Sequence, residues 1–242
     1  MENQIEYEIY SLPAAIMLQH NISDEIVADL NTYLDGLRAN ELRESASDSL
    51  VGQIHQGEQL KMNYNDQELQ KFKNIVEHLG LAYLKHFVEQ TKSPLKPKKI
   101  SIDKLWSVHS FEGDYNPIHD HSVPSLTGLA ATTWTKVPEQ ITKQKSPNDG
   151  EYNLFGASGN SDGFLAFNYG KTSSLDNPML KPPTTCTIQP EVGKLFIFPI
   201  WLQHMVYPFK GEGERRTIAA NLCGWHKNNA EKELVINKMY KE

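Results

Sequence analysis

The chain has 242 residues, a length that a single β-rich enzyme domain can use on its own. Apolar residues make up 39% of the sequence and charged residues 22%, which is enough to build a core and excludes a disordered chain. The 24 Lys and Arg residues against 30 Asp and Glu residues give a net charge of −6. That balance disfavours a protein whose main role is to bind nucleic acid or an anionic membrane.

The sequence has few features that would indicate a cellular compartment or a membrane segment. Two cysteines, Cys186 and Cys223, cannot form a disulfide framework, and neither lies in a zinc-binding CxxC pattern. The first residues carry acids where a signal peptide carries Lys or Arg. The apolar run 195–202 is interrupted by Pro199 and is far shorter than a membrane span. The sequence therefore predicts no membrane segment and a cytoplasmic location.

The first hundred residues follow a mainly helical pattern. From Ser23, apolar residues recur at the spacing of one helix face, and Ser23 or Asp24 is placed to cap the helix. A longer helix is predicted to begin near Asp66, because an apolar stripe of the same period runs over 69–88. It is expected to end before 93–99, where two prolines and a lysine cluster mark a boundary.

After residue 100 the pattern changes to short segments rich in β-branched and aromatic residues, separated by Gly, Pro and Asn. The predicted strands are 100–111, 126–137, 164–168, 184–189, 194–199 and 217–225. Helices followed by strands predict an α+β fold with a mainly β core, either a sandwich or a barrel. We expect a single domain over 1–242, with a mainly helical region at 1–99, the β core at 100–228 and a tail at 229–242. The polar loop 139–162 is long enough to be a lid, a binding loop or an insertion.

Three histidines form a candidate metal site. His119 and His121 are alternate residues of an extended segment, so both imidazoles can bind one ion while Asp120 points away. Asp120 remains the alternative ligand if the backbone there is not extended. His204 follows a predicted strand, and two close ligands plus a distant one are typical of a non-haem iron site. The alternative for each is an ordinary core or surface histidine, as the other six are interpreted.

A candidate carboxylate-binding pair lies in the last predicted strand. Alternation places Arg215 and Thr217 on one face, together with Ala219 and Asn221, and places Arg216 on the other. The guanidinium of Arg215 and the hydroxyl of Thr217 can then bind one carboxylate. The alternative is an ordinary solvent-facing arginine beside another.

These features come in a fixed order along 100–225. The motifs are Trp106, Gly113-Asp114-Tyr115, His119-Asp120-His121, Thr127-Gly128, Pro138, the segment 193–199, the segment 204–208, and the strand from Arg215 to Asn221. Their combination resembles the 2-oxoglutarate- and Fe(II)-dependent oxygenases, and most closely the small 2OG-Fe(II) oxygenases of bacteria and phages.

The resemblance implies a double-stranded β-helix (jelly roll) with a helical N-terminal region. It implies a dioxygenase, an oxidoreductase that uses 2-oxoglutarate and O2 to hydroxylate an unidentified substrate and releases succinate and CO2. His119, His121 and His204 would hold Fe(II), and Arg215 with Thr217 would bind the far carboxylate of 2-oxoglutarate. The broad superfamily usually has a carboxylate at the position of His121, so this ferrous site would be one unit more positive.

Two other functions stay open. The first is a three-histidine non-haem iron dioxygenase that does not use 2-oxoglutarate, in which Arg215 and Thr217 would need another explanation. The second is a non-catalytic metal- or ligand-binding jelly roll. A halogenase is disfavoured, because halogenases usually have a small residue where this chain has His121. The primary substrate and the oligomeric state are not determined by the sequence.

Four aromatic residues are candidates for an apolar wall that excludes water from the site: Trp134, Phe196, Phe198 and Trp201.

Overall fold

The protein is described from a computed structural model, which covers residues 15–49, 52, 54–123, 128–143, 161–170 and 184–226. Thr127, most of the loop 139–162 and the expected tail 229–242 lie outside the described residues. None of the described helices has the length and hydropathy that a membrane crossing needs. The expected location and domain boundaries stay predictions.

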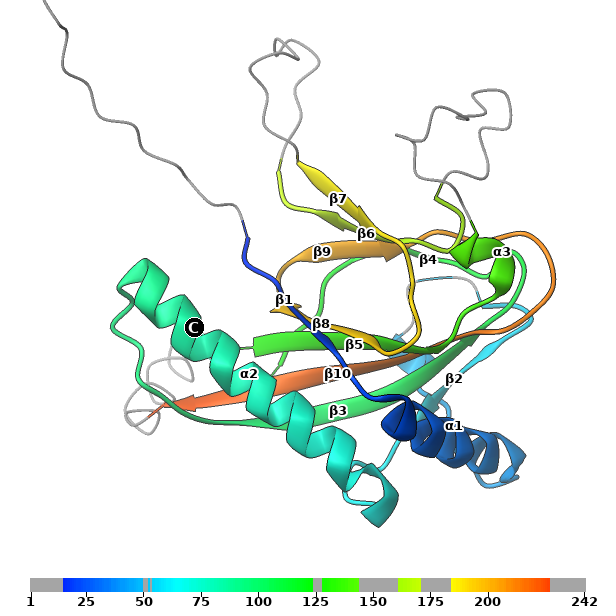
Figure 1. The fold of residues 1–242 in the computed structure, drawn as a ribbon, viewed down its shortest axis with the longest axis horizontal. Coiled ribbons are helices and arrows are strands. Elements are labelled where there is room, and N and C mark those ends of the chain that lie inside the picture. Colours follow the sequence, from blue (N-terminus) through cyan, green and yellow to red (C-terminus); the bar gives the residue numbers. More distant parts are fainter. Residues whose placement is uncertain are drawn as a thin grey trace, which may run out of the picture.

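Two antiparallel sheets face each other (Figure 1). The larger sheet has the order β1 (Leu18–Asn21), β8 (Lys194–Pro199), β5 (Gly128–Lys136), β10 (Arg215–His226), β3 (Pro97–Ser110) and β2 (Glu58–Lys61). The smaller sheet has the order β4 (Asn116–His119), β9 (Gln203–Val206), β6 (Leu165–Asn168) and β7 (Thr185–Ile188). The six predicted strands are found, the one at 194–199 with the expected ends and the other five with shifted ends. The short strands β1, β2, β4 and β9 were not predicted.

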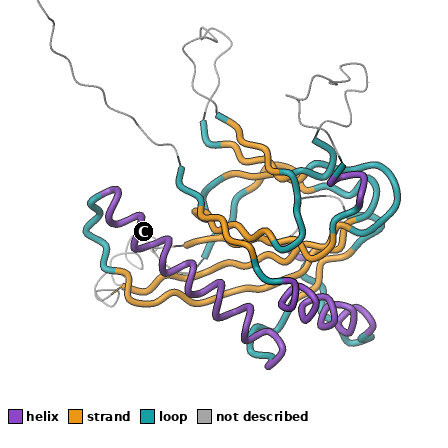
Figure 2. Tube along the Cα trace, viewed as in Figure 1, coloured by secondary structure: helices purple, strands orange, loops and turns teal. Residues whose placement is uncertain are grey.

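Two helices cover the outer face of the larger sheet, as both ribbon and tube show (Figures 1 and 2). α1 (Asp24–Ala39) begins where expected, because the side chain of Ser23 accepts a hydrogen bond from the backbone N–H of Ile26. A single turn of 3-10 helix (Gln67–Leu69) leads into α2 (Gln70–Thr91). A short helix, α3 (Glu139–Thr142), and a second 3-10 turn (Ser47–Ser49) complete the described helical residues. The prediction of two long N-terminal helices is confirmed.

The apolar side chains form two clusters, one on each face of the larger sheet. The outer cluster joins α1 and α2 to the sheet through residues such as Leu34, Val76 and Ile218. The inner cluster lies between the two sheets and includes Trp134, Phe167 and Phe198. The larger sheet is therefore covered on both faces, by the two helices outside and by the smaller sheet inside.

The register of β10 decides which of its side chains face the space between the sheets. Directly opposite residues of antiparallel strands share a face. On that inner face Arg215 pairs with Ser110, Thr217 with Val108, Ala219 with Trp106, and Asn221 with Lys104. The predicted alternation along β10 is confirmed, and Arg216 points to the outer, helix-covered face.

Candidate metal centre

The fold brings the three predicted histidines together. His119 ends β4 and pairs directly with His204 of β9, while His121 lies two residues beyond β4. A backbone hydrogen bond of 3.1 Å from the N–H of His121 to the carbonyl of Ile200 holds the chain there. One ring nitrogen from each histidine lies within 4.8 Å of the others. The three imidazoles thus converge on a single point from the smaller sheet.

Hydrogen bonds set the tautomer of each imidazole. The Nδ1 atom of His119 lies 2.7 Å from the carbonyl oxygen of Pro117, and that of His204 lies 2.9 Å from the carbonyl oxygen of Leu202. The Nδ1 atom of His121 lies 2.9 Å from Oδ1 of Asn221. Because these oxygens only accept, each Nδ1 must donate, which leaves the Nε2 lone pairs for a metal. Anchoring the second ring nitrogen in this way is usual for metal-binding histidines.

Burial keeps two of these rings neutral. Burial, together with the neighbouring His119, lowers the pKa of His121 to about 4. The same causes lower the pKa of His204 to about 3. Neutral imidazoles are the form that binds metal, and a set of nitrogen donors suits a divalent first-row ion such as Fe(II). Asp120, the alternative ligand, is exposed and is not among the converging donors.

Arg215 lies in the same cavity as the histidines. This inner cavity is lined by the three histidines, Arg215, Thr217 and Trp106, among others. Arg215 is 3% exposed, and its Nη1 donates to the carbonyl oxygens of Gly163 and Tyr207 at 2.9 and 3.1 Å.

Among the described residues no carboxylate forms an ion pair with Arg215, and its Nε is buried without a hydrogen-bond partner. Burial lowers the pKa of Arg215 to about 10, and the negative charge of Asp114 acts in the opposite direction. The guanidinium is therefore still charged at neutral pH. A buried charge of this kind is costly unless an anion compensates it.

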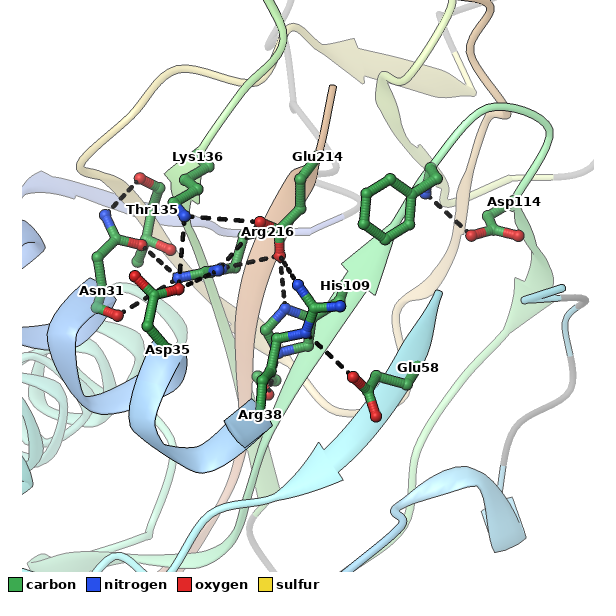
Figure 3. Close-up of polar contacts among 12 residues, drawn as sticks. Asn31, Asp35, Arg38, Glu58, His109, Asp114, Thr135, Lys136, Glu214 and Arg216 are labelled. Carbon is green, nitrogen blue, oxygen red and sulfur yellow. Dashed lines mark hydrogen bonds and ion pairs between the residues drawn. The ribbon is translucent and has the colours of Figure 1, made fainter. Parts of the chain in front are cut away.

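Asp114, from the Gly-Asp-Tyr motif, fixes the segment that covers the Arg215 end of the cavity. Its carboxylate is 1% exposed and accepts hydrogen bonds from the backbone N–H groups of His55 at 2.7 Å, Gln56 at 3.2 Å and Phe111 at 2.9 Å. Figure 3 shows the bond from Phe111. The tethered segment contributes Ile54 to the wall of the inner cavity.

The aromatic candidates for the cavity wall divide into three groups. Trp134 and Phe198 line the inner cavity. Phe196 packs in the inner apolar cluster, with its ring edge-on to Trp134 at 6.1 Å between centroids. Trp201 is 56% exposed, so its assignment to the wall is wrong. It follows β8 directly, in a turn, where side chains no longer alternate between the two faces of a sheet.

Neither Arg215 nor its neighbour Arg216 is solvent-facing, so the alternative interpretation of Arg215 as an ordinary surface arginine is wrong. Arg216 has a different environment from Arg215. It is 1% exposed and belongs to an ion network on the outer face of the larger sheet (Figure 3). Its guanidinium binds both carboxylate oxygens of Glu214, at 2.9 and 3.0 Å, and Asp35 of α1 at 2.6 Å. Glu214 also accepts from the fully buried His109 at 2.6 Å. The network fixes α1 to the start of β10, directly behind Arg215.

Three residues of the site were not identified as site residues from the sequence. Asn116 and Gln59 line the inner cavity, and Asn221 orients His121. Asn221 was placed on the same strand face as Arg215 and at the end of a motif, but was given no role, and Gln59 carried no signal because β2 was not predicted. The spacing of Asn116 from His119, which puts both at the ends of one short strand, was the available clue.

Comparison with known proteins places this site in a class. Residues 104–221 match the family model described as "Putative 2OG-Fe(II) oxygenase". No curated protein sequence matches the chain. The matched segment runs from β3 to β10 and includes all three histidines, Arg215 and Thr217.

Solved structures of low sequence identity share the fold. A prolyl-4-hydroxylase from Pseudomonas putida is 11% identical, with 86% of this chain and 91% of that chain covered and a TM-score of 0.50. HygX from Streptomyces hygroscopicus, solved with nickel and 2-oxoglutarate bound, is 8% identical, with 87% and 83% covered and a TM-score of 0.54. The epimerase SnoN of nogalamycin biosynthesis, described as a non-heme alpha-ketoglutarate-dependent enzyme, is 12% identical, with 86% and 78% covered and a TM-score of 0.53. The expected double-stranded β-helix is confirmed.

The family match and the converging histidines point to one class of protein. Over residues 104–221 the chain is similar to the 2-oxoglutarate-dependent oxygenases, oxidoreductases whose cofactors are Fe(II) and 2-oxoglutarate, and its three histidines are placed to hold one metal ion. The resemblance inferred from the order of motifs is thereby confirmed.

Proposed function

We propose that the protein hydroxylates a C–H bond of its primary substrate, consuming 2-oxoglutarate and O2 and releasing succinate and CO2. In this proposal His119, His121 and His204 hold Fe(II), and Arg215 with Thr217 binds the far carboxylate of 2-oxoglutarate. The observation that carries it is the buried Arg215, which shares a cavity with the three histidines and has no carboxylate partner among the described residues. A dicarboxylate that spans the cavity supplies the missing anion.

The protein's own residues orient the reactants and keep the site dry. Fe(II) with 2-oxoglutarate supplies the oxidising chemistry when both are bound. Arg215 receives the far carboxylate as a two-pronged donor, with the Thr217 hydroxyl beside it. The Nδ1 hydrogen bonds of the three histidines hold the rings in position without any metal. Trp134 and Phe198 exclude water from the wall of the cavity.

We assign the primary substrate to a second cavity that shares two histidines with the first. This outer cavity is lined by His119, His121, Trp106, Lys61 and Lys104, among others. Neither Arg215 nor Thr217 belongs to it, while His119 and His121 belong to both cavities. A substrate there would lie beside the metal ligands without contacting the proposed cosubstrate anchor.

Two rival functions are separated by one titration under nitrogen. Adding 2-oxoglutarate to the Fe(II)-loaded protein should produce a metal-to-ligand charge-transfer absorption, because the keto acid chelates the iron. A three-histidine dioxygenase that does not use 2-oxoglutarate, or a non-catalytic binding protein, gives no such band. Metal-free protein titrated in the same way is the blank. Absence of the band in iron-loaded protein rules out the proposed function.

Each of His119→Ala, His121→Ala and His204→Ala is expected to lose most of its bound iron while keeping the fold. Removing one of three nitrogen donors leaves too few ligands to hold the ion, and the imidazoles contribute little to the apolar clusters. Elemental analysis measures the iron, and circular dichroism checks the fold. Near-stoichiometric iron in the His204 variant would contradict the triad.

Asp120→Asn is the matched control, because Asp120 lies between two of the proposed ligands in sequence but is exposed. We expect it to retain iron at the wild-type level. If it loses iron while His121→Ala keeps it, Asp120 is the second ligand in place of His121.

A further inference from the structure

The side chain of Asn116 is in an unusual position beside the proposed metal ligands. Its Nδ2 lies 3.3 Å from Nε2 of His119, and its Oδ1 is buried without any hydrogen-bond partner in the described residues. Asn116 begins β4 and lines both the inner and the outer cavity. It therefore stands at the junction of the cosubstrate and substrate compartments.

The hydrogen bonds of His119 determine how the carboxamide is oriented. Nδ1 of His119 donates to the carbonyl oxygen of Pro117, so the neutral ring carries its lone pair on Nε2. The group facing Nε2 must then be the N–H of Asn116, which places the unsatisfied Oδ1 on the other side. A metal on Nε2 takes up that lone pair, and the N–H of Asn116 loses its acceptor.

The backbone of Gly52 passes beside the side chain of Asn116. A Cβ atom added at Gly52 would lie 2.7 Å from Oδ1 of Asn116 and 2.4 Å from the carbonyl oxygen of Tyr115, so a glycine is needed there. With a metal on Nε2 of His119, an oxygen of a molecule bound at that metal can accept the hydrogen bond from the N–H of Asn116.

We propose that Asn116 donates a hydrogen bond to the keto-acid end of 2-oxoglutarate and so positions this end next to the histidines. The inference rests on the proposed function, which puts the far carboxylate at Arg215 and the keto acid at the metal. Arg215 and Asn116 then hold opposite ends of one cosubstrate. An amide N–H suits this role because the keto-acid oxygens accept hydrogen bonds and carry negative charge.

The experiment compares Asn116→Ala and Asn116→Asp with wild type in the Fe(II)-loaded form under nitrogen. Two quantities are measured: the dissociation constant of 2-oxoglutarate and the wavelength of the charge-transfer band. Loss of one hydrogen bond to a charged group should raise the dissociation constant about 10- to 100-fold in Asn116→Ala. Asn116→Asp should raise it further, because a carboxylate there repels the keto acid. The band should move to shorter wavelength, because the bond stabilises the acceptor orbital of the keto acid.

Asn168→Ala, on β6, is the control, because Asn168 lines neither cavity. It should keep the wild-type affinity and band position. Measuring iron content distinguishes two roles of Asn116. If Asn116→Ala loses iron, but the protein that still holds iron binds 2-oxoglutarate with wild-type affinity, then Asn116 only orients His119. That result overturns the inference. Wild-type affinity and band position in Asn116→Ala overturn it as well. If wild type itself shows no band, the proposed function fails, and this inference fails with it.

Discussion

Arg215→Met is expected to weaken 2-oxoglutarate binding by roughly 30-fold to several thousand-fold, a loss of about 2–5 kcal/mol. The guanidinium is buried in the cavity of the histidines, with its Nε unsatisfied. Within the described part of the chain, two backbone carbonyls accept hydrogen bonds from its side chain, and they do not neutralise the charge. The far carboxylate of the cosubstrate can neutralise this charge. Methionine removes the guanidinium while keeping nearly the same side-chain volume, so the carboxylate loses its partner.

Arg215→Lys should fall between wild type and Arg215→Met. Lysine keeps the positive charge but replaces the planar two-pronged donor by a single ammonium group. Neither substitution touches a proposed metal ligand, so both variants should retain iron. The fold should survive Arg215→Met, because the change removes a buried charge that has no ionic partner among the described residues.

The measurement is the dissociation constant of 2-oxoglutarate for each Fe(II)-loaded variant under nitrogen, with iron content determined on the same samples. Equal affinity in wild type and Arg215→Met would remove the anchor assignment and revive a three-histidine dioxygenase. A variant that binds 2-oxoglutarate weakly but keeps its iron would support the assignment of Arg215, independently of the identity of the primary substrate.

The parts of the site that the sequence predicted depend on local backbone geometry. Alternation along an extended chain was enough to put His119 and His121 on one side and to separate Arg215 from Arg216. These relations need only the two-residue period of a strand. The position of His204 opposite His119 is a matter of strand pairing between β4 and β9. His204 was proposed as a ligand because two close ligands plus a distant one are typical of a non-haem iron site, but its pairing with His119 was not predicted, since neither strand had been predicted.

The parts that were missed depend on contacts between distant segments. β4 and β9 have only four residues each, too few to show a clear pattern against the surrounding turns. His109 was interpreted as an ordinary core or surface histidine, and the structure buries it; its contact with Glu214, 105 residues later, was not predicted. Arg216 contacts Asp35 across 181 residues. No local periodicity encodes such pairs, because the first forms only when β3 pairs with β10 and the second only when α1 packs on the larger sheet.

Arg215 and Arg216 are neighbours in sequence with opposite surroundings. Arg215 faces a cavity and lacks an ionic partner in the described residues, whereas Arg216 is paired on the outer face with Glu214 and Asp35. The environment of Arg215 suits a ligand-binding role and that of Arg216 a structural one. Two otherwise identical substitutions, one residue apart, should therefore affect different properties of the protein.

Arg216→Met is expected to lower the free energy of unfolding by about 3–5 kcal/mol, because it removes a buried guanidinium that binds both oxygens of the half-buried Glu214. Burial alone would raise the pKa of Glu214, but hydrogen bonds from His109 and Arg216 and the charge of Arg216 lower it to about 2 from its ordinary value of 4.5. A lowered carboxyl pKa gives stability that is present above about pH 4.5 and is lost as the pH falls towards 2. The difference between wild type and Arg216→Met should thus be full at pH 7 and shrink at pH 3.

Urea unfolding at the two pH values, followed by circular dichroism, measures this difference. Arg216→Lys provides the intermediate case, since it keeps the charge but cannot bind both oxygens of Glu214 as Arg216 does. Under conditions in which it is folded, Arg216→Met should bind 2-oxoglutarate nearly as well as wild type. The reason is that the side chain of residue 216 points away from the inner cavity. A loss of stability under 1 kcal/mol at pH 7 would show that the ion network contributes little to the fold. A loss of 2-oxoglutarate affinity larger than that of Arg215→Met would show that the anchor had been assigned to the wrong arginine.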